Sequence, residues 1–162
     1  MKNILVVYFS LDGNTRDMAN RLANEFNCKA EEIMLVKPMP KSTFARMLVG
    51  GGQVTVNKLP LIEPLTVDPN EYDQIVIGTP VWAGKCSSPV RSFIESIKEK
   101  KRIRAAFTFS AGGDNAKCEA QLRRLLPDLD CVAGFGDRRG KYAAGNETRY
   151  NEFAAALRKL ID

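Results

Sequence analysis

Apolar residues form short runs along the chain, and each run is followed by a segment with helical spacing. Residues 4–9 are continuously apolar, as expected of a parallel strand that is covered on both faces. In the next segment Met18, Ala19, Leu22 and Phe26 recur at the three- and four-residue spacing of one helical face. The N-terminal region therefore predicts a buried strand followed by an amphipathic helix.

The same alternation continues to the C-terminus. Further strands are predicted by apolar runs at residues 30–36, 74–78, 104–109 and 131–135. Ser88-Pro89 indicates the start of one helix, and Pro127 indicates the end of another. A last helix is indicated by an apolar face formed by Tyr150, Phe153, Ala154, Leu157 and Ile161. Alternating strands and helices pair in parallel through right-handed crossovers. The sequence therefore predicts an α/β fold, a three-layer sandwich around a five-stranded parallel sheet, in one domain covering residues 1–162.

The stretch between Pro38 and Pro69 has the least regular pattern. Phe44, Met47 and Leu48 indicate a helix in this stretch, and we expect the three glycines at 50–52 to end that helix. No linker or internal repeat divides the sequence, so the stretch belongs to the same predicted domain.

Composition excludes several kinds of catalytic site. The sequence contains no histidine, which excludes Ser-His-Asp triads, Cys-His dyads and histidine-ligated metal centres. The cysteines form no C-x-x-C pair, so we predict no metal site and interpret the thiols as buried apolar groups at Cys28, Cys86, Cys118 and Cys131. Any catalysis must use other acids and bases, or the chemistry of a cofactor.

The formal net charge of +5 permits acidic partners. The densest basic cluster, residues 98–104, contains no interleaved aromatic residue of the kind that stacks on single-stranded nucleic acid. We interpret this cluster as a solvated surface and expect no nucleic-acid partner. No charged-then-apolar leader opens the chain, and the longest apolar run, residues 4–9, is too short to span a membrane. We therefore expect a cytoplasmic protein without a membrane partner.

Three predicted loops follow the first, third and fourth strands. In open parallel sheets ligands bind beyond the carboxyl ends of the strands, where the strand order reverses. We therefore expect a ligand at the three loops, which read Ser10-Leu11-Asp12-Gly13-Asn14-Thr15, Thr79-Pro80-Val81-Trp82-Ala83-Gly84-Lys85 and Ser110-Ala111-Gly112-Gly113-Asp114.

The first of these loops combines hydroxyls, an amide side chain and a glycine directly before a predicted helix. Free backbone N–H groups and the positive end of the helix dipole suit a phosphate monoester. The same residues also fit an ordinary strand-to-helix turn, with Asn14 or Thr15 as N-cap and Gly13 at a positive φ. The loop lacks the G-x-G-x-x-G pattern of dinucleotide-binding proteins.

The second and third loops suit a planar ring. Trp82, the single tryptophan of the sequence, lies in the second loop, where a flat aromatic favours stacking on a ligand; the alternative is a tryptophan that covers the core. The adjacent glycines Gly112 and Gly113 permit close approach of the backbone to a ligand. Together the three loops predict a phosphate joined to a planar heterocycle.

Two segments resemble a known family. Residues 6–22 combine an apolar strand, a serine, a small residue, a threonine and a helix rich in Ala and Leu, which resembles the signature of flavodoxins. Tyr72-Asp73 and the stretch from Gly78 to Gly84 are similar to flavodoxin-like proteins that hold FMN between such loops. The resemblance extends over nearly the whole chain in the order of its elements. It implies the strand order 2-1-3-4-5 and FMN as the cofactor.

The resemblance also implies site residues. The FMN phosphate would be bound by Ser10, Asp12, Gly13, Asn14 and Thr15. The isoalloxazine ring would be flanked by Thr79, Pro80, Val81, Trp82, Ala83, Gly84, Lys85, Ser110, Ala111, Gly112 and Gly113, with Trp82 as its aromatic contact.

Two departures from typical flavodoxins bear on function. Electron-carrier flavodoxins are acidic and often cover the flavin with a tyrosine of the third loop, whereas this chain is basic and residues 110–114 contain no aromatic. The first interpretation is an electron carrier that uses bound FMN and a redox partner protein, for which an acidic partner complements the basic surface. The second is an enzyme that takes hydride from NAD(P)H at an open flavin face and reduces a quinone. The basic surface and the uncovered ring favour the enzyme, whereas the small size and the lack of a nicotinamide motif favour the carrier, which we place slightly ahead. A flavin-free regulatory domain on the same fold is a third interpretation.

Overall fold

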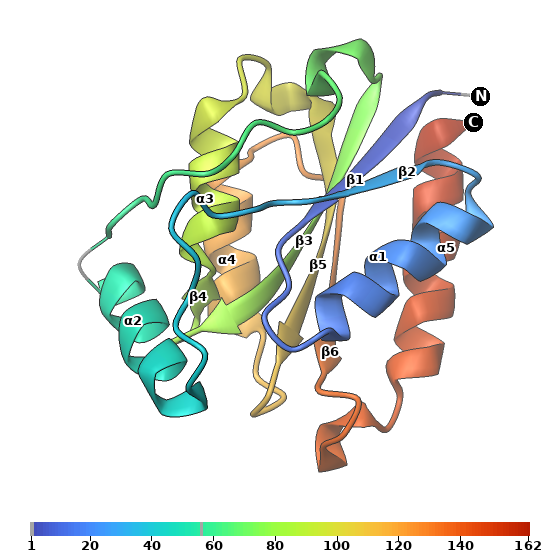
Figure 1. The fold of residues 1–162 in the computed structure, drawn as a ribbon. Coiled ribbons are helices and arrows are strands. Elements are labelled where there is room, and N and C mark those ends of the chain that lie inside the picture. The colour runs from blue at the N-terminus through green and yellow to red at the C-terminus, as the bar shows by residue number, and fades with distance from the viewer. Residues whose placement is uncertain (1, 56) are drawn as a thin grey trace.

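The computed structural model describes residues 2–55 and 57–162, and a twisted parallel sheet lies at its centre (Figure 1). The parallel strands are β1 (Ile4–Tyr8), β2 (Lys29–Glu32), β3 (Gln74–Trp82), β5 (Ile103–Ser110) and β6 (Cys131–Gly136). Their order is β2-β1-β3-β5-β6, which confirms the predicted α/β sandwich and its strand order. A short strand that was not predicted, β4 (Lys85–Cys86), pairs antiparallel with the end of β3.

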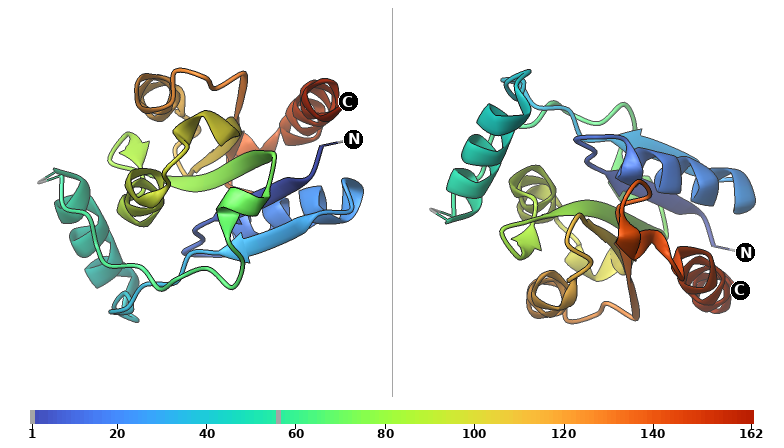
Figure 2. Two further views of the ribbon diagram at one scale, coloured as in Figure 1. Left: turned by 90° about the horizontal axis from the view of Figure 1, so that it is seen from above. Right: turned by 90° about the horizontal axis from the view of Figure 1, so that it is seen from below.

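Helices cover both faces of the sheet (Figure 2). The α-helices of the described residues are α1 (Asn14–Glu25), α2 (Thr43–Thr55), α3 (Ser88–Ser96), α4 (Ala116–Leu125) and α5 (Asn146–Ile161). Short 3-10 helices are η1 (Pro69–Glu71), η2 (Lys100–Arg102) and η3 (Lys141–Ala143). Each predicted helix is therefore present, although the expected end of α2 differs from the observed one.

Two apolar clusters separate the layers. Successive strand residues point to opposite faces, so Val6 and Phe107 pack against α1 and α5, whereas Val7 and Ile77 pack against α3 and α4. Both clusters are almost completely buried. The continuous apolar run of β1 is therefore explained by burial on both faces, as the sequence predicted.

The structure differs from the prediction after β2. The strand expected at residues 30–36 ends at Glu32, and α2 continues through the glycines at 50–52, so the prediction that these glycines end the helix was wrong. Gly50 lies against the indole of Trp82, where an added Cβ would be 3.2 Å from the ring. This close packing on β3 outweighs the low helix propensity of glycine. The side chains of Phe44 and Met47, which suggested the helix, lie outside the described residues.

Membrane-spanning helices and clustered metal ligands are both absent from the residues that the structure describes. None of the helices in residues 2–55 and 57–162 is both long and apolar enough to cross a membrane. Within the same ranges no three His, Cys, Asp or Glu side chains gather in a way that could hold a metal ion.

Candidate functional site

The loops after β1, β3 and β5 lie together at one edge of the sheet, at the bottom of Figure 1. The three strands are adjacent and parallel, so their carboxyl ends meet at that edge. Tyr8 is in register with Gly78, and Gly78 with Phe107. The structure therefore brings together the three loops that the sequence singled out.

The first loop turns directly into α1. Ser10 Oγ accepts a hydrogen bond from the backbone N–H of Gly13 at 3.1 Å, and Gly13 adopts a left-handed conformation with φ +99°. Asn14 Nδ2 donates to Asp12 Oδ1 at 3.2 Å. These contacts hold the turn in a conformation that glycine adopts without strain.

The start of α1 retains groups that can bind an anion. Gly13 is the N-cap and supplies no side-chain cap, so the prediction of Asn14 or Thr15 as N-cap was wrong, whereas the positive φ of Gly13 was correct. Thr15 is 1% exposed, and its hydroxyl has no hydrogen-bond partner among the described residues. The backbone N–H of Asn14 donates to Asp12 Oδ1 at 3.5 Å. The remaining N–H groups of the first turn and the helix dipole make this position favourable for negative charge.

The second predicted loop is mostly strand. Residues 79–82 belong to β3, and Trp82 pairs with Lys85 across a two-residue hairpin turn. Ala83 and Gly84 form this turn with φ values of 47° and 76°, which match the left-handed pair of a type I′ turn. The expectation that the third strand ends at residue 78 and is followed by a loop over residues 79–85 was therefore wrong.

Trp82 lies in the apolar core at the end of β3. The indole is 9% exposed and meets Phe9 edge to face, with ring centroids 5.6 Å apart. Gly50 of α2 covers another part of the ring. Contact between Trp82 and a ligand ring stays a prediction, and the partners that the structure shows are those of a core tryptophan.

Thr79 links β3 to the start of α3. It is fully buried, and its Oγ1 accepts a hydrogen bond from the backbone N–H of Ser87 at 2.9 Å. The same hydroxyl lies 3.0 Å from Ser87 Oγ. The other residues of this predicted loop are more accessible: Pro80, Val81 and Gly84 are half-buried, and Ala83 and Lys85 are exposed.

The third loop is held by a residue that sequence analysis missed. Asn115 Oδ1 accepts from the hydroxyl of Thr108 at 2.7 Å, and Asn115 Nδ2 donates to the carbonyl of Gly113 at 3.4 Å. This fixes the loop so that Ala111 and Gly112 are exposed. An asparagine that follows a pair of glycines and directly precedes a helix is a turn signal, and this signal could have identified Asn115.

Ser110 begins the third loop and is buried. Its carbonyl accepts hydrogen bonds from the backbone N–H groups of Gly113 and Asp137, both at 3.2 Å. The second bond joins the third loop to the segment that follows β6. A chain segment outside the three predicted loops therefore also reaches this edge of the sheet.

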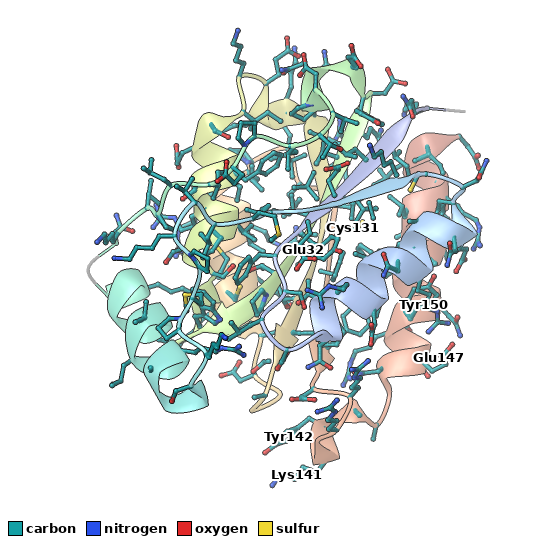
Figure 3. The ribbon with its side chains drawn as sticks, viewed as in Figure 1. Glu32, Cys131, Lys141, Tyr142, Glu147 and Tyr150 are labelled. Carbon is teal, nitrogen blue, oxygen red and sulfur yellow. The ribbon has the colours of Figure 1, made fainter. Side chains whose placement is uncertain are left out.

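That segment, residues 137–142, contacts both the first and the third loop. The backbone N–H of Arg138 donates to Asn14 Oδ1 at 3.2 Å. The ring of Tyr142 lies so close to Gly113 that an added Cβ would be 2.7 Å from Tyr142 Cγ. Figure 3 shows Lys141 and Tyr142 on η3 at the end of the molecule where the loops lie. An aromatic side chain thus contacts the third loop, although it comes from a distant part of the sequence.

The family model described as Flavodoxin matches residues 3–136. This chain belongs to the flavodoxin family. The NAD(P)H dehydrogenase (quinone) of Archaeoglobus fulgidus is 27% identical to it over 161 residues, which cover 90% of this chain and 83% of the relative.

Solved structures show the same fold as this flavodoxin-family chain. A flavoprotein from Lactobacillus acidophilus NCFM, crystallised in complex with FMN, is 23% identical, with a TM-score of 0.70 over 95% of this chain and 99% of the other. The NAD(P)H:quinone oxidoreductase from Methanothermobacter marburgensis is 11% identical, with a TM-score of 0.51 over 99% of this chain and 96% of the other. At these identities the likeness concerns the fold.

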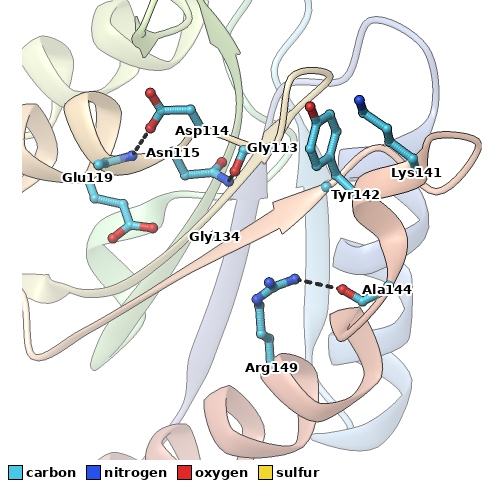
Figure 4. A pocket seen from close by; sticks show the side chains of 11 residues that line it. Gly113, Asp114, Asn115, Glu119, Gly134, Lys141, Tyr142, Ala144 and Arg149 are labelled. Atoms are coloured by element: carbon cyan, nitrogen blue, oxygen red, sulfur yellow. Dashed lines mark hydrogen bonds between the residues drawn. The ribbon is translucent and has the colours of Figure 1, made fainter.

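A cavity of about 440 Å³ in this flavodoxin-family chain adjoins the third loop (Figure 4). Gly113 and Tyr142 line one side, and Glu119 and Arg149 lie farther along it. Burial raises the pKa of Glu119, although the nearby Arg123 opposes this change. Charged lining residues, among them Glu119, Lys141 and Arg149, make the cavity polar, and it lies beside the third loop, which we predict to flank a planar ring.

The thiols of this flavodoxin-family chain are held in the neutral form. Burial raises the pKa of Cys86 to about 12 and that of Cys28 to about 11. Cys86 and Cys118 are buried, as predicted, but Cys28 and Cys131 are only half-buried. A neutral thiol is a poor nucleophile, so the protein offers no activated cysteine among these four.

Proposed function

We propose that this flavodoxin-family chain binds one FMN and passes electrons through it to a partner protein. The first loop carries the proposal: Thr15 lies in the first turn of α1, its hydroxyl has no hydrogen-bond partner among the described residues, and the N-cap Gly13 supplies no side-chain cap. A phosphate monoester supplies the negative charge and the acceptor oxygens that these groups lack. FMN has such a phosphate, which riboflavin does not.

The isoalloxazine ring of FMN fits the same edge of the sheet. We assign it to the space between the hairpin of residues 79–85 and the third loop, residues 110–113. Ala83 and Lys85 of the hairpin and Ala111 and Gly112 of the loop are exposed there. FMN supplies the electron chemistry when bound, while the chain binds its phosphate, orients its ring and limits access of water.

An electron carrier is the function that the described site supports best. The contact of Tyr142 with Gly113 places an aromatic side chain beside the third loop. The absence of an aromatic within residues 110–114 therefore no longer implies that one face of the flavin ring is uncovered. Arg139 and Lys85 give this end of the molecule exposed positive charge, which suits an acidic redox partner, whereas Arg138 is ion-paired with Asp17. The basic cluster at residues 98–104 lies elsewhere, before and at the start of β5, and is paired with acids such as Glu95.

A second candidate is an NAD(P)H-dependent quinone reductase. The Archaeoglobus fulgidus relative, named NAD(P)H dehydrogenase (quinone), favours this function. Hydride transfer requires the nicotinamide to lie against one free face of the flavin. In this chain Tyr142 would have to leave such a face accessible.

Titration of the purified protein with FMN and with riboflavin tests the cofactor. We expect one FMN per chain and much weaker binding of riboflavin, because riboflavin has no phosphate oxygens to accept hydrogen bonds from the donors of the first loop. Equal affinity for the two flavins would refute the phosphate site.

Anaerobic stopped flow separates the two functions. For a carrier, neither NADH nor NADPH bleaches bound FMN within seconds, whereas a one-electron donor reduces it in two resolved steps. Rapid bleaching by either nucleotide, followed by reoxidation with a quinone, would establish the reductase instead.

A further inference from the structure

Arg138 follows β6 but lies against the first loop. Its backbone N–H donates to Oδ1 of Asn14, a residue 124 positions away in the sequence, at 3.2 Å. Its guanidinium is ion-paired with Asp17 in the first turn of α1. A Cβ added to Gly13 would lie 3.5 Å from Arg138 Nη2. The cation therefore lies beside the start of α1, where the phosphate is proposed to bind.

Two hydroxyl groups of the first loop are free to donate a hydrogen bond to a ligand. The hydroxyl of Thr15 has no partner among the described residues, although the residue is 1% exposed. Ser10 Oγ accepts from Gly13, and its own hydroxyl hydrogen goes to no described acceptor. A phosphate monoester carries between one and two negative charges near pH 7, which neutral donors alone leave uncompensated.

We infer that Arg138 is a ligand of the FMN phosphate and exchanges its ion pair with Asp17 for one with the phosphate. The planar guanidinium binds two phosphate oxygens at once, which suits it to this role. The side chains of Arg138 and Asp17 are 45% and 52% exposed, so the exchange breaks no buried contact. The inference rests on the proposed function, because it assigns a further residue to the same site.

Two neighbouring arginines are positioned differently. Arg16 is held by Glu32 through Nε at 3.0 Å and Nη2 at 2.7 Å, on the β2 side of α1. Arg139 is exposed, and its backbone N–H donates to Asp137 at 2.9 Å. Arg139 therefore provides a matched control, with the same charge one residue away.

The test compares the dissociation constants of FMN and riboflavin in the full chain and its variants. We expect Arg138→Gln to weaken FMN binding about tenfold, the effect of one partly exposed charge-assisted hydrogen bond, and to leave riboflavin unchanged. Arg139→Gln is expected to change neither. Asp17→Asn is expected to tighten FMN binding, because it removes both the competitor for Arg138 and a carboxylate near the phosphate. Arg138→Lys is expected to restore part of the FMN preference.

The outcomes separate this inference from the proposed function. If the unsubstituted protein binds FMN and riboflavin equally, the phosphate site itself fails, and the inference with it. If that protein prefers FMN but Arg138→Gln keeps the whole preference, only the inference is overturned. Equal losses for both flavins in Arg138→Gln also overturn it, since they assign Arg138 to supporting the loop. Circular dichroism of each variant confirms that the fold is retained.

Discussion

The first loop and the β3–β4 hairpin follow neighbouring strands, yet they leave different groups free. In the first loop, Gly13 turns the chain into α1 without a side-chain cap, and the hydroxyl of Thr15 has no described partner. In the hairpin, Trp82 pairs with Lys85, and in the part of β3 just before it the hydroxyl of Thr79 is hydrogen-bonded. One loop retains unpaired polar groups, and the other has satisfied most of them internally.

Because only the first loop keeps free hydrogen-bonding groups, we expect the two regions to play different roles in ligand binding. Even the end of the hairpin is anchored, because the N–H of Cys86 donates to Oε1 of Gln121 at 2.9 Å. The hydroxyl of Thr15 is free to donate to a charged ligand, whereas that of Thr79 is already hydrogen-bonded, so the first loop gains more from a ligand than the hairpin does. We therefore regard the first loop as the recognition element and the hairpin as the rigid wall beside it.

The largest expected effect concerns the hairpin. Trp82→Ala removes a buried indole from its contacts with Phe9 and Gly50 and is expected to lower the free energy of unfolding by about 3–5 kcal/mol. Urea unfolding measures this change, and Trp82→Phe, which retains an aromatic ring, should cost less. A loss below about 1 kcal/mol, together with weakened FMN binding, would instead make Trp82 an exposed ring contact.

Removal of single hydroxyls should weaken FMN binding in the first loop but not in β3. Ser10→Ala and Thr15→Ala are each expected to weaken FMN binding by about 1.5–3 kcal/mol, because each removes a donor to a charged phosphate. Isothermal titration calorimetry measures the change. Thr79→Val is the control in β3, just before the hairpin: it leaves the N–H of Ser87 unpaired and should reduce stability but not FMN affinity. Similar losses of affinity in all three variants would remove the distinction.

A smaller effect is expected when the same substitution is made at two glycines with a left-handed backbone conformation, one in the first loop and one in the hairpin. Gly13→Ala and Gly84→Ala, at φ values of +99° and +76°, should each cost about 1–2 kcal/mol of stability through backbone strain. We expect only Gly13→Ala to weaken FMN binding as well, since only Gly13 shapes the phosphate loop. Thermal unfolding and flavin titration of both variants check this, and an equal effect on FMN would contradict it.

The smallest effect at neutral pH is expected for Cys86. Burial raises its pKa from an ordinary value of 9.0 to about 12, so folding favours the protonated thiol. The resulting stability is fully present below the unfolded pKa and is lost as the pH rises through the interval from about 9 to about 12.

Alkylation followed by mass spectrometry tests the same burial. At pH 8 the native protein should label Cys28, which is half-buried, before Cys86. Unfolding in urea should remove the difference. Labelling of Cys86 as early as Cys28 in the native protein would show that the hairpin opens, against the rigid role assigned to it.

The strands and the first loop could be predicted because their signals are local. The run at residues 4–9 is apolar throughout because β1 is buried on both faces, and Gly13 occupies the one position of the loop where a left-handed conformation is needed. The hairpin was misjudged although Ala83-Gly84 forms its turn, because alanine is a rare residue at a positive φ.

The amino-acid sequence by itself determined the order of strands and helices, the flavodoxin-like sheet and the loops that gather at its carboxyl edge. Only the tertiary structure decided which side chains meet there: Arg138 beside Asn14, Tyr142 against Gly113, and Trp82 beneath Gly50. Hydrophobic periodicity and glycine turns act over a few residues, so they can be read along the chain. Contacts between residues far apart in sequence depend on how the layers pack, and no local pattern contains that information.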